Sequence, residues 1–391
     1  MEENEKETVK SKSDEEEIIK TMDIVRYGIA GMGSIGMMHA DKLLSGSIPG
    51  GILCAVCTGH TEKLQPFKEK YPDVRICGSY REMLSCVDAA LIATPHPLHP
   101  QMAIEAFGAG KHVLIEKPAG ADTKHVRLMN KAAADSGKVF AIMYNMRLNP
   151  LYKKVRELVR SGELGALKRI TWLVTDWYRS QAYYDTGTWR ATWEGEGGGV
   201  LMNQAVHNLD LLQWITGIPD SVQAFMQYGA GHNIQVEDDV TAYLQFPGGA
   251  TGLFVTATHE VPGTNRLEIA GDRGKLVAEN NEIIFYRNRI SEREFNIINT
   301  DPFAKPENWR CHVPVKEGGD GHAGILREFT DAILYGKRLT APGEDGILGL
   351  TLANAMYLSA AQGKQVDLKT WDDDEYYELL RGRIEKEKYL K

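Results

Sequence analysis

The chain has 391 residues, of which 43% are hydrophobic, and a formal net charge of -8 at pH 7. This length exceeds one ordinary domain, no basic patch indicates a nucleic-acid partner, and no apolar run reaches the roughly twenty residues that a membrane span requires. Residues 1–22 are rich in Glu and Lys and contain no apolar signal-peptide core. We therefore expect a disordered acidic extension on a cytoplasmic protein without a membrane partner.

The first predicted strand, residues 24–30, leads directly into Gly31-Met32-Gly33-Ser34-Ile35-Gly36, which opens a helical pattern to about residue 44. A glycine turn between a strand and a helix is typical of dinucleotide binding. Gly31 permits the tight turn, Gly33 lets a pyrophosphate approach the backbone, and Gly36 lets the helix pack on the strand. A purely structural glycine turn is the alternative. We predict that this stretch binds the phosphates at the helix amino terminus.

A second strand, residues 53–58, ends where a dinucleotide fold usually places an acid on the adenosine ribose. This chain has Thr58-Gly59-His60 there, with neither an acid nor an arginine. Thr58 can bond a ribose hydroxyl, and His60 can contact a phosphate. We expect NAD and leave NADP open. Cys54 and Cys57 have a zinc-like spacing in the same apolar run, but no second pair completes a site, so we expect no metal.

Strands and helices then alternate. Helices are predicted at residues 62–70, 102–109 and 123–136, and strands at residues 74–76, 88–93, 113–115 and 139–144. This rhythm predicts a Rossmann-type, doubly wound parallel sheet over residues 23–147. Ligands bind at the carboxyl ends of such strands. The polar residues found there are cofactor-binding candidates, although each can also be a solvated loop residue: Thr94, Pro95, His96, His99, Glu116, Lys117 and Asn145.

The pattern changes after residue 148. A helix to about residue 161 precedes β-rich runs at residues 167–178, 221–228, 240–246, 251–258, 266–270, 275–279 and 283–287. We predict a second, α+β domain over residues 148–368 with a largely antiparallel, open sheet that binds substrate and forms a dimer or tetramer. Helices at residues 325–335 and 347–361 pack near this sheet or on the first domain. Residues 369–391 form a charged helix or arm.

Between these strands, Trp189-Arg190 and three glycines precede a helical pattern that contains Asn203, His207 and Asp210. The spacing of i, i+4 and i+7 predicts that one helix face presents all three side chains. The alternative is a helix at the edge of the core with a satisfied histidine.

Several motifs occur together in a fixed order: Gly31-x-Gly33-x-x-Gly36, Ala93-Thr94-Pro95 with His99, Glu116-Lys117-Pro118, and three glycines followed by His207-x-x-Asp210. Over residues 23–368 the sequence resembles the glucose-fructose oxidoreductase, inositol dehydrogenase and rhizopine catabolism family. The resemblance implies a tightly bound nicotinamide cofactor near Glu116-Lys117 and a sugar or cyclitol held by the second domain. It also implies that Lys117 contacts cofactor and substrate, that His207 is the general base or acid, and that the cofactor is lined by Thr94, Pro95, His96, His99, Asn145, Trp189 and Arg190.

One position departs from the family. Many members have Asp where this chain has Asn203, and an amide cannot accept a proton. We therefore expect Asn203 to orient the substrate, while His207 transfers the proton and Lys117 binds the developing alkoxide. Tyr178 can stack on a sugar face. With Lys117, Asn203, His207, Asp210 and His322, it completes the predicted substrate site.

These features predict an NAD(P)-dependent dehydrogenase that acts on a secondary hydroxyl or ketone of a sugar, glycoside or cyclitol. Oxidation at C3 of a glucosyl unit follows from the habit of the family alone. Two alternatives stay open. One is a glycosidase or transhydrogenase that recycles its nicotinamide in place. The other is an inactive nucleotide-binding sensor, in which Lys117 and His207 are merely structural.

Overall fold

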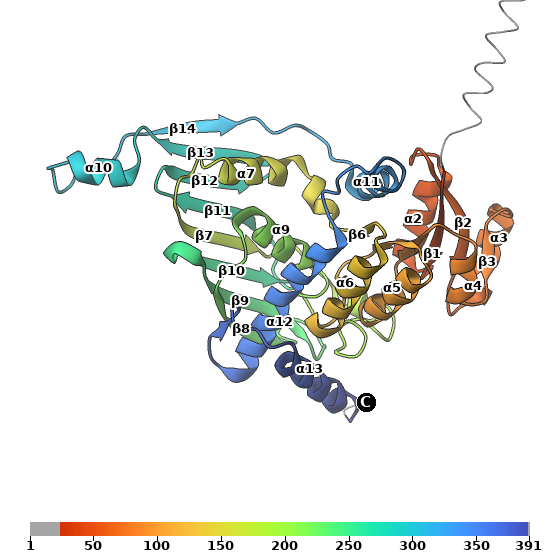
Figure 1. Cartoon of the computed structure of the whole chain (residues 1–391). Helices are drawn as coiled ribbons and strands as arrows, with labels where there is room; N and C mark the ends of the chain where they lie inside the picture. The colour runs from red at the N-terminus through yellow and green to blue at the C-terminus, as the bar shows by residue number, and fades with distance from the viewer. Residues whose placement is uncertain (1–23, 390–391) are drawn as a thin grey trace, which may run out of the picture.

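The computed structural model of the protein describes residues 24–389 and shows two β-sheets with helices around them (Figure 1). The predicted extension, residues 1–22, lies outside the described residues. Within residues 24–389, no helix combines the length and the apolar character that are needed to cross a bilayer.

The first sheet has six strands in the order β3-β2-β1-β4-β5-β6, and all neighbours are parallel. Its strands are β1 (Val25–Ala30), β2 (Gly51–Cys57), β3 (Arg75–Cys77), β4 (Ala89–Ile92), β5 (His112–Ile115) and β6 (Phe140–Ile142). This is the strand order of a dinucleotide-binding fold, in which a crevice opens where the order reverses between β1 and β4. The predicted Rossmann-type sheet is confirmed.

The helices of this half follow the strands in alternation: α2 (Ser34–Leu44), α3 (Gln65–Lys70), α4 (Tyr80–Ser85), α5 (His99–Gly108) and α6 (Thr123–Ser136), with the short turns η1 (Thr61–Leu64), η2 (His96–Leu98) and η3 (Asn145–Leu148). Every residue of β4 is buried, because helices cover both faces of a parallel sheet. The six-residue helix α4 was not predicted. The Ser79 hydroxyl caps it by accepting a hydrogen bond from the backbone N–H of Glu82.

The second sheet has nine strands in the order β14-β13-β12-β11-β7-β10-β9-β8-β15. They are β7 (Leu167–Val174), β8 (Ser221–Tyr228), β9 (Glu237–Gln245), β10 (Thr251–Ala257), β11 (Asn265–Gly271), β12 (Gly274–Glu279), β13 (Glu282–Asn288), β14 (Asn308–Val313) and β15 (Val366–Asp367). The pair β7–β10 is parallel and the other neighbours are antiparallel, so the expected, largely antiparallel sheet is confirmed.

The central strand β7 is shorter than predicted. It ends at Val174, and the chain then follows a loop instead of a strand: Thr175 N–H donates to the carbonyl of Thr264, and Arg179 N–H donates to the carbonyl of Thr258. Residues 175–180 therefore leave the sheet and are available to the site described below.

The remaining helices are α7 (Pro150–Arg160), α8 (Gln181–Tyr184), α9 (Val206–Thr216), α10 (Glu292–Ile298), α11 (Gly321–Tyr335), α12 (Gly346–Gln362) and α13 (Asp373–Lys388), with the short turns η4 (Pro247–Gly249) and η5 (Gly343–Asp345). Figure 1 shows α7, α9 and α12 on the face of the second sheet that is turned toward the first. Helix α11 returns to the first sheet, where the Thr330 hydroxyl lies 2.7 Å from the Tyr27 hydroxyl. Helix α12 packs on both α9 and α6, so it joins the two halves.

Candidate active site

The glycine turn between β1 and α2 has the geometry that phosphate binding requires. Gly31 has a φ of +93°, and a Cβ on Gly31 or Gly36 would collide with backbone atoms of Ala93 or of Gly31 itself. A Cβ on Gly33 would instead meet nothing within 4 Å, and Gly33, Ser34 and Ile35 are exposed. Helix α2 has no side-chain cap. Its first N–H groups therefore face open space, which suits the pyrophosphate of a dinucleotide.

Thr58 and His60 follow β2, next to this turn. The N–H of Gly31 bonds to the carbonyl of Cys57, which places Thr58 directly beside the glycines. His60 is exposed, and its Nδ1 lies 3.4 Å from a carboxylate oxygen of Glu62. Both residues stay candidates for the adenosine end of the cofactor.

Glu116, at the end of β5, is buried and bonds to a histidine that the sequence did not single out. Its Oε1 lies 2.7 Å from Nε2 of His39 on α2. Burial alone would raise the pKa of Glu116, but the hydrogen bond and charge of His39, together with Lys117, lower it to about 2. His322 on α11 stacks edge-on against His39, with ring centroids 5.6 Å apart, and its Nδ1 lies 3.5 Å from the Asn145 amide nitrogen. Asn145 and His322 therefore gather around the Glu116–His39 pair.

The loop after β4 is held by its two histidines. His99 is buried between two loops, with Nδ1 2.8 Å from the carbonyl of Pro118 and Nε2 2.7 Å from that of Thr94. His96 donates from Nδ1 to the carbonyl of Glu196 in the second half at 3.1 Å, and the Trp189 ring packs edge-on against it. Burial, with the charges of His99 and Lys117, lowers the pKa of His96 to about 3. His99 thus fixes the loops that carry Thr94, Pro95 and Lys117, and His96 joins the halves.

Lys117 reaches across to the second half of the chain. Its Nζ donates a 3.0 Å hydrogen bond to the backbone carbonyl of Asn203. Burial lowers the pKa of Lys117, the carboxylates of Glu116 and Glu196 oppose that shift, and the guanidinium groups of Arg179 and Arg190 add to it.

His207 lies in the first turn of α9, near Lys117. Burial, with the charge of Lys117, lowers the pKa of the His207 imidazole to about 3. Its Nδ1 is buried and has no hydrogen-bond partner among the residues that the structure describes. Native proteins rarely leave a buried nitrogen unpaired, so this atom indicates a place for a bound group. A neutral imidazole beside an ammonium can accept a proton from an alcohol while the ammonium stabilises the alkoxide.

The predicted single helix face is wrong in two respects. Helix α9 begins at Val206, so Asn203 lies in the turn before it. Asp210 is buried, and Arg147 binds both of its carboxylate oxygens, at 2.8 and 2.6 Å. Arg147 itself is fully buried and also pairs with Asp345. Because its oxygens are taken by Arg147, Asp210 anchors α9 against η3 and η5 and is not free to bind substrate as we predicted.

Glu196 is a site residue that the sequence reasoning missed. It is 2% exposed; one oxygen accepts from the Asn203 amide at 2.5 Å and the other from the N–H of Ala191 at 2.6 Å. Burial raises the pKa of Glu196, and Ala191, Arg190 and Asn203 oppose that shift. The side-chain nitrogen of Asn203 donates to Glu196, which leaves the side-chain amide oxygen of Asn203 for a ligand. Glu196 stands among glycines, and its local sequence did not mark it as a site residue.

The remaining candidates lie around this centre. Asn203 also donates to the Tyr183 hydroxyl at 3.2 Å, and Arg190 donates to the same hydroxyl at 2.8 Å. Tyr178 is exposed, next to Arg179, whose guanidinium bonds to its carbonyl. Trp189 and Arg190 therefore lie between the His96 loop and Tyr183, and Tyr178 lies at the rim.

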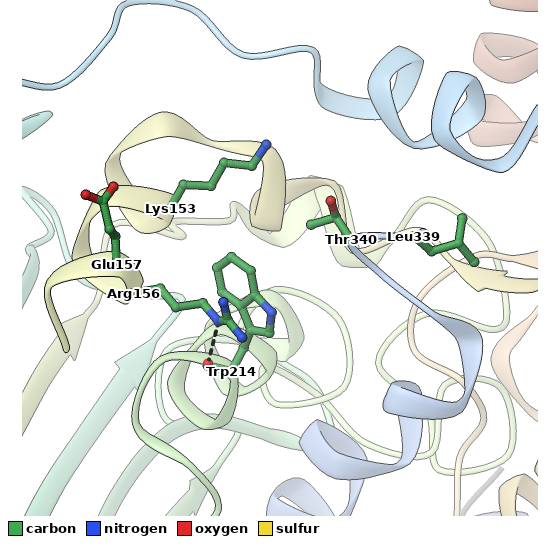
Figure 2. Close-up of a pocket in the computed structure, with 6 residues that line it drawn as sticks. All are labelled: Lys153, Arg156, Glu157, Trp214, Leu339 and Thr340. Atoms are coloured by element: carbon green, nitrogen blue, oxygen red, sulfur yellow. Dashed lines mark hydrogen bonds between the residues drawn. The ribbon is translucent and has the colours of Figure 1, made fainter. Parts of the chain in front are cut away.

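A separate pocket of about 470 Å³ is lined by residues of α7, of the last turns of α9 and of the segment at residues 339–340 (Figure 2). Its lining residues are Lys153, Arg156, Glu157, Trp214, Leu339 and Thr340, and the Arg156 guanidinium bonds to the carbonyl of Trp214 at 3.1 Å. None of the predicted site residues lines this pocket, so we do not assign the reaction to it.

Comparisons with known proteins agree with this geometry. Residues 25–144 match the family model of an oxidoreductase family with an NAD-binding Rossmann fold, and residues 152–277 match the GFO/IDH/MocA C-terminal domain. The chain is 25% identical over 351 residues to an inositol 2-dehydrogenase of Rhizobium meliloti, covering 88% of this chain and 99% of the relative. It is 26% identical over 311 residues to a levoglucosan dehydrogenase of Pseudarthrobacter phenanthrenivorans, covering 71% of this chain and 79% of the relative.

Among solved structures, the WlbA dehydrogenase from Bordetella pertussis in complex with NADH and UDP-GlcNAcA is similar. Its TM-score is 0.76 at 28% identity, covering 90% of this chain and 99% of the other. The two family models, the glycine turn and the shared fold lead to one conclusion: the chain belongs to the GFO/IDH/MocA family of NAD-dependent oxidoreductases.

Proposed function

We propose that this protein transfers a hydride between NAD and a secondary hydroxyl or ketone of a sugar, glycoside or cyclitol. One observation carries the proposal. The Lys117 ammonium bonds to the backbone carbonyl of Asn203, four residues before His207, and burial together with the charge of Lys117 lowers the pKa of the His207 imidazole. A cation and a proton acceptor from different halves therefore meet at one place. The relatives named for inositol and levoglucosan support this class of substrate.

The bound nicotinamide supplies the hydride acceptor. The residues at the carboxyl ends of β1, β4 and β5 would hold the cofactor, because the open space at Gly33 and the uncapped start of α2 fit its phosphates. Lys117 donates to the substrate oxygen and stabilises its negative charge as the alkoxide forms. His207 takes the hydroxyl proton, and the side-chain amide oxygen of Asn203 accepts a bond from a neighbouring hydroxyl. The reverse steps reduce a ketone.

Oxidation at C3 of a glucosyl unit is the finer part of the proposal. The test mixes the purified protein with NAD and a panel of glucosides, inositols and amino sugars, and follows the reduced-nicotinamide absorbance band. Analysis of the product by NMR then identifies the oxidised carbon. An increase in absorbance together with a 3-keto product supports oxidation at C3. A keto group at another carbon supports hydride transfer from a secondary hydroxyl but not oxidation at C3.

The same assay separates the alternatives. A sugar that is converted without net reduction of NAD indicates a glycosidase or transhydrogenase that recycles its cofactor. No reaction with any sugar, together with unchanged nucleotide binding when Lys117 or His207 is replaced by Ala, would indicate an inactive nucleotide-binding sensor.

We also infer that the protein forms a homo-oligomer through the outer face of β8, β9 and β10. Phe225 is 64% exposed, and Tyr243 and Leu253 are directly opposed on β9 and β10 and are also exposed. Exposed aromatic and aliphatic residues on an open sheet favour sheet-to-sheet association. Light scattering of the wild type and of Phe225→Glu tests this: the variant should dissociate, and a wild-type monomer contradicts the inference.

A further inference from the structure

We propose that the substrate carries an anionic group, a carboxylate or a phosphate, and that Arg179 and Arg190 bind it at the mouth of the site. This inference rests on the proposed function and names its substrate class. Arginine is suited to both anions, because its planar guanidinium presents paired donors to their oxygens.

The backbone holds Arg179 rigidly in the loop that follows β7. Its N–H donates to the carbonyl of Thr258 at 2.9 Å, and its carbonyl accepts from Nε2 of His232 at 2.8 Å. The guanidinium lies over the ring of Tyr183, 5.1 Å from the centroid, and one of its N–H groups donates a hydrogen bond to the carbonyl of Tyr178. The remaining donors of Arg179 have no hydrogen-bond partner among the described residues.

Arg190 approaches the same tyrosine. Its guanidinium lies 4.6 Å from the centroid of the Tyr183 ring and donates to the Tyr183 hydroxyl at 2.8 Å. The Tyr183 hydroxyl also accepts a hydrogen bond from the side-chain amide of Asn203. The backbone carbonyl of Asn203 in turn accepts from Lys117. Tyr183 therefore places both guanidinium groups beside the reacting centre.

Neither guanidinium has an acidic partner. Within residues 24–389, no carboxylate lies within ion-pair distance of Arg179 or Arg190, whereas Arg147 and Arg266 each pair with two acids. Both charges act on Lys117, and so do the carboxylates of Glu116 and Glu196, so three cations and two carboxylates share one part of the site. The cations exceed the carboxylates by one charge, and an anionic group of the ligand beside Arg179 and Arg190 would neutralise this excess. We conclude that the two arginines are reserved for a negative charge of the ligand.

The two arginines differ in whether they can also contact the cofactor. Arg190 is adjacent to Trp189, which packs on His96 in the predicted cofactor loop, so Arg190 can also contact the cofactor. Arg179 lies on the side of Tyr178, at the rim, and is the cleaner probe of the substrate.

The experiment measures, by calorimetry on the NADH-loaded protein, the binding of methyl glucoside, glucuronic acid and glucose 6-phosphate. We expect at least one of the two anionic sugars to bind about tenfold tighter than the neutral one, a difference of about 1.4 kcal/mol in binding free energy, because the guanidinium donates charge-assisted hydrogen bonds to the anion. Arg179→Gln should bring this ratio toward one. The matched control, Arg289→Gln, removes an exposed arginine that pairs with Glu307 in the connection between β13 and β14 and should leave the ratio unchanged.

Equal affinities for all three sugars in the wild type would overturn the inference, as would an Arg179→Gln variant that keeps the wild-type ratio. These outcomes are distinct from failure of the proposed function. In that case no sugar, neutral or charged, reduces NAD, whereas calorimetry reports binding without turnover.

Discussion

The Lys117 ammonium donates to the backbone carbonyl of Asn203, a residue 86 positions later in the chain. Lys117 stands at the carboxyl end of a strand of the first sheet, and Asn203 precedes the helix α9 that packs on the second sheet. The bond fixes where the ammonium points. Because His207 lies only four residues after Asn203, the bond also brings the cation near the imidazole that we propose as the base.

Replacing Lys117 by Met should lower kcat/KM by about a hundredfold to a thousandfold, the range for loss of one donor to a developing oxyanion. Steady-state assays with the best sugar of the panel measure it. Lys111→Met, just before the opposite end of the same strand, is the matched control and should retain activity. Full activity of Lys117→Met would remove Lys117 from the reaction.

Replacing His207 by Asn should lower kcat by about a hundredfold to ten-thousandfold, because the general base is lost. The wild-type pH profile adds a second check. Burial and Lys117 lower the pKa of His207 to about 3, so the imidazole stays deprotonated and able to accept a proton as the pH falls through its usual range. We therefore expect kcat/KM to show no decline centred near pH ~6.5. An inflection there that disappears in His207→Asn would contradict this environment.

Two substitutions in the glycine turn should have different effects, one on NAD binding and the other on the stability of the fold. Gly33→Ala has room for its methyl group in the protein, so we expect an unchanged melting temperature but weaker NAD binding, because that group occupies the space next to the phosphates. Gly36→Ala collides with the backbone of Gly31 and should lower the melting temperature. Nucleotide titration and thermal unfolding of both variants check the contrast. Tight NAD binding by Gly33→Ala would refute the phosphate site.

Glu196 should act through Asn203. Removing its carboxylate in Glu196→Ala frees the amide to rotate, which we expect to raise KM and lower kcat, while Glu194→Ala, an exposed acid paired with Lys388, should have no effect. The decisive measurement is a double-mutant cycle. If Glu196 only positions Asn203, then Glu196→Ala adds little to Asn203→Ala, with a coupling energy of about 1–2 kcal/mol. Strict additivity would show that Glu196 acts elsewhere.

Buried neutral histidines should make the protein sensitive to acid. Burial lowers the pKa values of His96 and His207 to about 3 in the folded state, with Lys117 contributing to both. The unfolded chain binds these protons near pH ~6.5, so it gains protons first, and stability falls as the pH drops from about 6.5 toward 3. Each histidine contributes a slope of about 1.4 kcal/mol per pH unit. Urea unfolding across this window should show a shallower slope for His96→Asn; identical slopes would contradict the assignment.

Local sequence signals were enough to predict the first sheet and most of its binding edge. Apolar runs, the glycine turn and the polar residues after each strand are short-range features, and parallel strands bring their carboxyl ends to one edge. Thr94, Glu116 and Lys117 could therefore be predicted to lie together. Pairings between residues of distant segments could not be predicted from the sequence.

His39 with Glu116, and Arg147 with Asp210, form only when the helices pack on the sheets. Glu196 and Arg179 come from loops whose paths depend on the second sheet, and nothing in their neighbourhood marks them. The start of α9 was placed too early because the apolar spacing continues through the turn that holds Asn203.

The transfer of deuterium from a sugar labelled at its ring carbons to the nicotinamide tests the central claim most directly, because it reports the hydride step even when the cofactor is recycled. Rapid quenching and mass spectrometry of the cofactor detect the label. We predict labelled nicotinamide with the wild type and strongly slowed labelling with Lys117→Met and with His207→Asn. No label from any glucoside, uronic acid or inositol, or wild-type rates of labelling in both variants, would contradict the account.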